Sequence, residues 1–146
     1  MKISCSVNGG AATVEARADE VLLDVLRREL GLTSVRPTCG IGVCGACTAL
    51  VDGEPISTCL LLAPLAEGRE ITTVEGLRGH AVQKAFVEAH AFQCGYCTPG
   101  MILTAARLVE EIPSPTDAEI ALGLAGNLCR CGCYVKIADA VRRAAA

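Results

Sequence analysis

The chain has 146 residues, of which 51% are hydrophobic, and its formal net charge is −3. That length suits one ordinary domain or two small ones. It has no Trp, only two Phe and two Tyr, and no basic tract, so the composition gives no indication of nucleic-acid binding. Met1–Gly10 lacks the apolar core of a secretion signal, and the longest aliphatic stretch, Leu60–Ala63, is too short to cross a bilayer. We therefore expect a soluble, cytoplasmic protein without membrane insertion.

The first half has the pattern of a small mixed α/β domain. Apolar residues alternate from Ile3 to Val7, and Asn8-Gly9-Gly10 is a hairpin signal that predicts a second strand through Thr13–Ala16. Leucines at helix spacing then predict a helix, with Asp19 as its cap and Gly31 as its end. Further strands are expected at Thr48–Val51, Pro55–Leu61 and Glu70–Val74.

From about Leu77 the pattern is helical. Apolar residues recur at helix spacing from Ala81 to Ala89, and Thr98-Pro99 predicts the start of a helix that runs to about Glu111. Thr116 and Glu119 have the spacing of a capping box ahead of a short helix that is expected to end near Gly126. A final helix is expected from about Tyr134 to the C-terminus.

Ten cysteines are the most informative feature of the composition. Structural disulfides are rare in a reducing compartment, so this number favours metal ligation. Four of them have the spacing C-x4-C-x2-C with a distant fourth, which is typical of a plant-type [2Fe–2S] ferredoxin: Cys39, Cys44, Cys47 and Cys59. A structural zinc site also takes four thiolates, but it usually pairs two short C-x2–4-C units.

Glycines separate the cysteines of this first set. They allow the chain to wrap around an anionic cluster, so that backbone N–H groups face its sulfurs. Gly40–Gly45 also matches G-x-G-x-x-G. No helix is expected after it, and it contains Cys44, so a dinucleotide site is not predicted.

A second set of cysteines lies in the helical half. Cys94 and Cys97 form a C-x2-C unit, and Cys129, Cys131 and Cys133 follow after a helical insertion. Cys97 and Cys131 precede predicted helix starts, where the positive end of the helix dipole favours an anionic cluster. The residues alone therefore indicate a second iron–sulfur site.

Three segments together resemble a known family. They are CGIGVCGACT at Cys39–Thr48, QCGYCTPG at Gln93–Gly100 and GNLCRC at Gly126–Cys131. The same motifs, in the same order, mark the iron–sulfur (small) subunit of the xanthine dehydrogenase family of molybdenum hydroxylases, and the similarity covers essentially the whole chain. The resemblance implies an α+β chain, with a β-grasp, plant-type ferredoxin-like domain over residues 1–76 and a four-helix [2Fe–2S]-binding domain over residues 77–146.

The resemblance also implies two [2Fe–2S] clusters. The first cysteine set matches the ligands of the ferredoxin-type cluster, and the second cluster would be held by Cys94, Cys97, Cys129 and Cys131. In this family a large subunit binds molybdopterin and oxidises the substrate, and FAD is bound by a medium subunit. Electrons pass from the molybdopterin through the helical-domain cluster and then the ferredoxin-type cluster to FAD. Gln93 and Cys131 match positions near the pterin.

One segment departs from the family pattern. Relatives commonly read Cys-Arg-Cys-Thr-Gly-Tyr where this chain has Cys129-Arg-Cys-Gly-Cys-Tyr134. Cys133 therefore stands at a glycine position, and we expect it to be a protonated thiol rather than a ligand.

The sequence offers no nucleophile or acid–base pair, so we expect the chain to be a non-catalytic electron-transfer subunit of an oxidoreductase complex. Two alternatives are an independent ferredoxin-type electron shuttle and a zinc protein without redox function.

Overall fold

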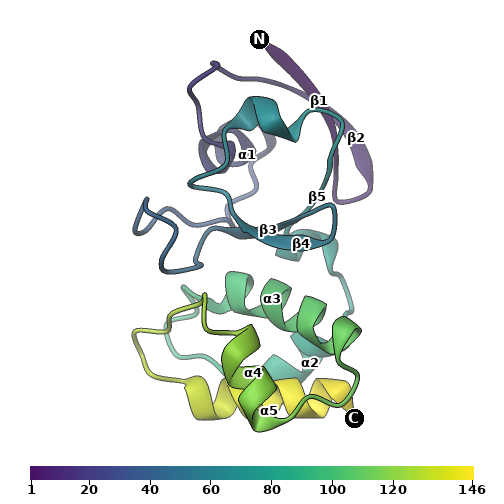
Figure 1. Cartoon of the computed structure of the whole chain (residues 1–146), viewed down its shortest axis with the longest axis vertical. Coiled ribbons are helices and arrows are strands. Elements are labelled where there is room, and N and C mark those ends of the chain that lie inside the picture. Colours follow the sequence, from purple (N-terminus) through teal and green to yellow (C-terminus); the bar gives the residue numbers. More distant parts are fainter.

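The computed structural model describes residues 1–146 and consists of a five-stranded sheet above a group of helices (Figure 1). The strand order is β2-β1-β5-β3-β4. β1 pairs with β5 in parallel, and the other neighbours are antiparallel. The strands are β1 (Lys2–Val7), β2 (Gly10–Glu15), β3 (Thr48–Val51), β4 (Glu54–Ser57) and β5 (Glu70–Thr72).

One helix, α1 (Leu22–Leu30), packs against this sheet. Its Leu22, Leu23 and Leu26 are buried in one cluster with residues of β3 and β5. This order of a hairpin, a helix and a mixed sheet is the β-grasp arrangement expected of the N-terminal domain. Two short 3-10 turns complete it, η1 (Ala63–Ala66) and η2 (Val74–Gly76). The last strand is shorter than expected because the chain turns into η2 after Thr73.

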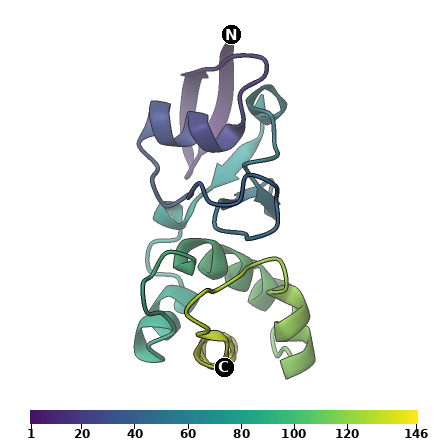
Figure 2. The same ribbon diagram turned by 90° about the vertical axis from the view of Figure 1, so that its left-hand side faces the viewer.

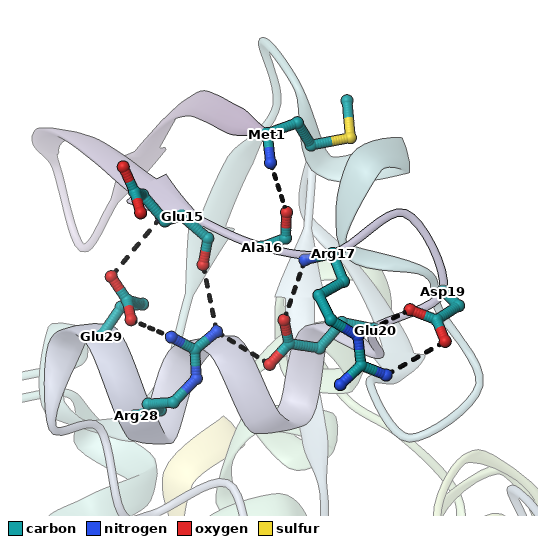
Figure 3. A network of polar contacts seen from close by, with 8 residues as sticks. All are labelled: Met1, Glu15, Ala16, Arg17, Asp19, Glu20, Arg28 and Glu29. Atoms are coloured by element: carbon teal, nitrogen blue, oxygen red, sulfur yellow. Dashed lines mark hydrogen bonds and ion pairs between the residues drawn. The ribbon is translucent and has the colours of Figure 1, made fainter.

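The start of α1 corrects one expectation. The residue at the helix N-cap is Val21, which forms no side-chain cap, so Asp19 does not cap the helix. Asp19 instead pairs with Arg17 at 3.0 Å. Figure 3 shows that this pair belongs to a polar network at the end of the domain, in which Arg28 of α1 bonds Glu20 at 2.8 Å and the carbonyl of Glu15 at 3.1 Å. The network joins α1 to the end of β2.

Four helices form the second half of the chain, as expected. They are α2 (Ala81–Glu88), α3 (Thr98–Glu111), α4 (Asp117–Gly123) and α5 (Tyr134–Ala145). Their buried faces form one core of 16 residues, which includes Phe86, Met101 and Ile137. No helix of the chain is both long and apolar enough to span a bilayer.

Local signals define the helix starts well. Thr116 and Glu119 form the expected capping box, and Pro99 lies in the first turn of α3. α2 has a cap that the sequence did not indicate, because Nδ1 of His80 accepts a hydrogen bond from the Val82 N–H. α4 ends at Gly123, three residues before the expected end near Gly126.

The two halves meet where α3 lies beneath β3 and β4 (Figures 1 and 2). Gly100 of α3 lies close to the carbonyl of Gly45. A Cβ atom at Gly100 would lie 2.2 Å from the Gly45 oxygen, so only glycine fits there without a shift of the backbone. Close backbone packing therefore fixes how α3 sits against the Gly45 loop.

We expect Gly100→Ala to lower the free energy of unfolding by about 1–3 kcal/mol, because the new methyl group overpacks this contact. Alanine is the better helix former, so a loss of stability must come from the contact itself. Gly126→Ala is the matched control, since a Cβ there meets no atom within 4 Å. Urea unfolding followed by circular dichroism measures both variants. Equal stability of the two variants would contradict the close packing.

Candidate metal centres

The first cysteine set surrounds one loop of the N-terminal domain. Cys39, Cys44 and Cys47 lie between α1 and β3, and Cys59 follows β4 by two residues. Cys47 and Cys59 are buried, whereas Cys39 and Cys44 are half-buried. Three glycines of the loop have positive φ values, which reverse the chain around the sulfurs: Gly40 (67°), Gly42 (73°) and Gly45 (70°).

The thiols of this set meet in two pairs. The Cys44 side chain lies close enough to Cys39, and the Cys47 side chain close enough to Cys59, to affect the pKa of its neighbour. No group of three or more His, Cys, Asp or Glu side chains is arranged to hold a single metal ion. A [2Fe–2S] cluster takes two protein ligands at each of its two irons, whereas a zinc site brings four to one ion. The paired thiols therefore fit a [2Fe–2S] cluster better than zinc.

Backbone amides make the outer thiol of this set acidic. The N–H groups of Ile41 and Cys44, together with the Cys44 thiol, lower the pKa of Cys39 to about 6. Burial, followed by the contact with Cys47, raises the pKa of Cys59 to about 11. The amides that stabilise a thiolate at Cys39 are the donors that an anionic cluster requires.

The second set joins two segments of the helical domain. Cys94 and Cys97 lie between α2 and α3, and Cys129 and Cys131 precede α5. Here Cys131 lies beside Cys94, and Cys129 lies beside both Cys97 and Cys133. Cys97 is the N-cap residue of α3, so the positive end of that helix faces the site, as expected.

Hydrogen bonds and burial act in opposite directions within this second set. The Tyr96 N–H lies 3.5 Å from the Cys94 sulfur and lowers the pKa of that exposed thiol. Burial, followed by the contact with Cys129, raises the pKa of Cys97 to about 12. Tyr134 also contacts this set, because its hydroxyl accepts a hydrogen bond of 2.8 Å from the Cys129 N–H.

Cys133 lies on the inner side of the second set. It is buried at the N-cap of α5, in the core of the helical domain. Its backbone N–H points to the Cys129 sulfur at 3.5 Å. Burial, followed by the contact with Cys129, raises the pKa of the Cys133 thiol. Cys131, in contrast, lies beside Cys94, which is the exposed cysteine of the set.

The two sets lie next to each other. The Leu128 N–H donates a hydrogen bond of 2.9 Å to the carbonyl of Cys44, so one bond joins a cysteine of the first set to the residue before Cys129. A cavity of about 460 Å³ lies between the sets and is lined by Cys44, Cys94 and Cys129, among others. In Figure 2 the loop between α1 and β3 and the loop between α4 and α5 lie next to each other between the sheet and the helices.

Comparisons with known proteins identify two iron–sulfur domains in the chain. Residues 5–75 match a 2Fe-2S iron-sulfur cluster binding domain, and residues 73–142 match a [2Fe-2S] binding domain. The nicotinate dehydrogenase small FeS subunit of Eubacterium barkeri is 48% identical over 97% of this chain and 93% of its own. The nicotine 6-hydroxylase small subunit of Paenarthrobacter nicotinovorans is 46% identical over 97% of this chain and 87% of its own.

Solved structures extend the similarity to the fold. A chain of quinoline 2-oxidoreductase from Pseudomonas putida 86 matches with a TM-score of 0.96 and 44% identity, over 99% of this chain and 92% of that one. The chain belongs to the iron–sulfur small subunits of the molybdenum hydroxylase family. Aldehyde oxidoreductase from Desulfovibrio desulfuricans also matches, with a TM-score of 0.94 and 38% identity over 99% of this chain, which spans 17% of that much longer one.

As an iron–sulfur small subunit, the chain is a non-catalytic part of an oxidoreductase complex, and it contains two [2Fe–2S]-binding domains. Gln93, which the family pattern associates with the pterin, is exposed. It lines a shallow cavity of about 250 Å³ together with His90 and Cys133. Gln93 and Cys133 therefore line the same cavity, beside Gly132 of the turn that follows Cys131.

Sequence reasoning missed the polar residues that join the two sites. Asn127 is buried and donates a hydrogen bond of 3.2 Å from Nδ2 to the Gly45 carbonyl. Arg36 donates a hydrogen bond to the Gly95 carbonyl, and the Tyr96 hydroxyl donates one to the Pro37 carbonyl, so this pair also connects the two domains. For Asn127 and Tyr96 the only available signal was their position inside cysteine motifs, and Arg36 had none.

For the second site we expect Cys131→Ser to abolish or strongly perturb the helical-domain cluster, because its thiol meets Cys94. The ferredoxin-type cluster should be spared. Cys133→Gly is the matched control and should retain both clusters, since the family has glycine at this position. Electron paramagnetic resonance of the reduced variants distinguishes the two clusters. A dispensable Cys131 with an essential Cys133 would show that the ligand register is shifted by two residues.

Proposed function

We propose that this small subunit holds two [2Fe–2S] clusters and relays electrons between its partner subunits. The first cluster is bound by Cys39, Cys44, Cys47 and Cys59, and the second by Cys94, Cys97, Cys129 and Cys131. The observation that carries the proposal is that each proposed ligand lies beside a second one, so that two thiols are available for each iron: Cys39 with Cys44, Cys47 with Cys59, Cys94 with Cys131 and Cys97 with Cys129. Cys129 also lies beside Cys133, and Cys133 is left out of the proposed ligands because the family pattern has glycine at its position. When bound, each cluster supplies a centre that accepts and releases one electron.

The proposed direction of transfer rests on the resemblance to the family. We propose that a large subunit brings its molybdopterin to the second site, where Gln93 is exposed and Cys131 lies next to exposed Cys94. Electrons then leave from the first site to FAD on a medium subunit. The chain itself binds no substrate in this proposal.

The backbone between the sites supports a short route for the electron. Cys44 belongs to the first site and Cys129 to the second, and the hydrogen bond between Leu128 N–H and Cys44 O connects them. Electron tunnelling decays less steeply through covalent and hydrogen bonds than through empty space. This chain therefore offers a nearly continuous bonded path from one cluster site to the other.

The surface near the first site favours a permanent subunit over an independent shuttle. Residues 37–51 and 55–66 contain no charged side chain. Within them Ile41 is 70% exposed and Leu60 is 60% exposed, and Leu60 packs against Gly42 of the cysteine loop. Transient partners are usually steered by complementary charge. An uncharged apolar rim instead suits an interface that stays covered.

Purification of the native complex tests this function. We expect one molybdopterin-binding and one FAD-binding polypeptide to accompany the chain, with about four iron and four acid-labile sulfide per small subunit. Metal, sulfide and flavin analysis of the purified complex gives these numbers. The isolated chain should oxidise no organic substrate. Stoichiometric zinc without labile sulfide, or a monomer that is fully active alone, would refute the proposal.

A further inference from the structure

Arg36 of the N-terminal domain and Tyr96 of the helical domain each donate hydrogen bonds to backbone carbonyls at or beside the other residue. Nη1 of Arg36 donates hydrogen bonds to the carbonyls of Gly95 (2.6 Å) and Tyr96 (2.8 Å). In return, the Tyr96 hydroxyl donates to the carbonyl of Pro37 at 2.9 Å. The Arg36 guanidinium also lies 4.9 Å from the centre of the Tyr96 ring, within the range of a cation–π contact. We call these four contacts the Arg36–Tyr96 clamp.

The clamp touches both cysteine sets. Arg36 lies three residues before Cys39, and its backbone N–H bonds the carbonyl of Ala46, so it is fixed to the first loop. Gly95 and Tyr96 are the two residues between Cys94 and Cys97. The clamp thus connects the backbone of the first site directly to the short turn that carries half of the second.

No other hydrogen bond ties residues 94–97 to the N-terminal domain. Leu128 and Asn127 hold the other cysteine segment of the second site, through the carbonyls of Cys44 and Gly45. Arg107 and Glu54 also join the domains at 3.0 Å, between α3 and β4, but neither residue belongs to a cysteine loop. Arg36 itself forms no ion pair with a carboxylate, so its hydrogen-bonding capacity is directed to these carbonyls.

We propose that Arg36, with Tyr96 as its reciprocal partner, is a positioning residue that fixes the separation of the two cluster sites. The inference rests on the two-cluster function proposed above. Charge-assisted hydrogen bonds are stronger than neutral ones. Here they hold residues 94–97, which make no other hydrogen bond to the N-terminal domain. These contacts keep the distance between the two sites constant, so that an electron passes from one site to the other without a movement of the domains.

The test is the magnetic interaction between the two reduced clusters, measured by electron paramagnetic resonance on the full chain. This interaction depends steeply on the distance between the clusters. Arg36→Ala should retain both clusters but lose the sharp interaction splitting of the wild type, as the turn at Gly95 adopts a range of positions. Glu54→Gln is the matched control, because it removes an interdomain ion pair outside the cysteine loops, and it should retain the wild-type splitting.

A wild-type splitting in Arg36→Ala, with both clusters present, overturns the proposal, and so does an equal loss in Glu54→Gln. If Arg36→Ala cannot assemble the second cluster, Tyr96→Phe decides, because it removes only the hydroxyl bond to Pro37. A weakened splitting in that variant then supports the clamp, and an unchanged one refutes it. Failure of the proposed function is distinct, since the wild-type chain itself would then lack two reducible clusters.

Discussion

The arrangement of both metal sites depends on the close backbone contact around Gly45. Its carbonyl accepts hydrogen bonds from the Thr48 hydroxyl at 2.7 Å and from Asn127 at 3.2 Å, and it lies against Gly100 of α3. A Cβ atom at Gly45 would itself lie 2.4 Å from the Gly126 carbonyl. One residue without a side chain therefore brings the first cysteine loop against both segments of the second site. The hydrogen bond from the Leu128 N–H to the Cys44 carbonyl lies beside this contact.

The two sites obtain similar electrostatics from different structures. In the first, a glycine-rich loop turns its own amides toward Cys39. In the second, a turn supplies the Tyr96 amide to Cys94, and the start of α3 supplies the helix dipole at Cys97. Each site also combines buried and more accessible thiols. An anionic centre in either site would be surrounded by amide donors on one side and apolar core on the other.

Much of this organisation could be predicted from local sequence. The Thr98-Pro99 helix start and the capping box at Thr116 each depend on residues close together in the chain, and both are confirmed. The C-x4-C-x2-C spacing depends on local sequence in the same way, and it places three cysteines on one loop between α1 and β3. The cap predicted at Asp19 was wrong because α1 begins at Leu22 with Val21 as its N-cap, which leaves Asp19 two residues before the cap position, where it pairs with Arg17. The Arg36–Tyr96 clamp joins residues 60 positions apart, so it follows only from the packing of the two domains.

The central claim is that this one chain carries two electron-transfer centres. Anaerobic reductive titration of the purified full chain, monitored by visible absorption and electron paramagnetic resonance, tests it most directly. The account predicts the uptake of about two electrons per chain, one for each [2Fe–2S] cluster, with two distinct signals in the reduced protein. Uptake of a single electron with one signal, or no reduction at all, would contradict it.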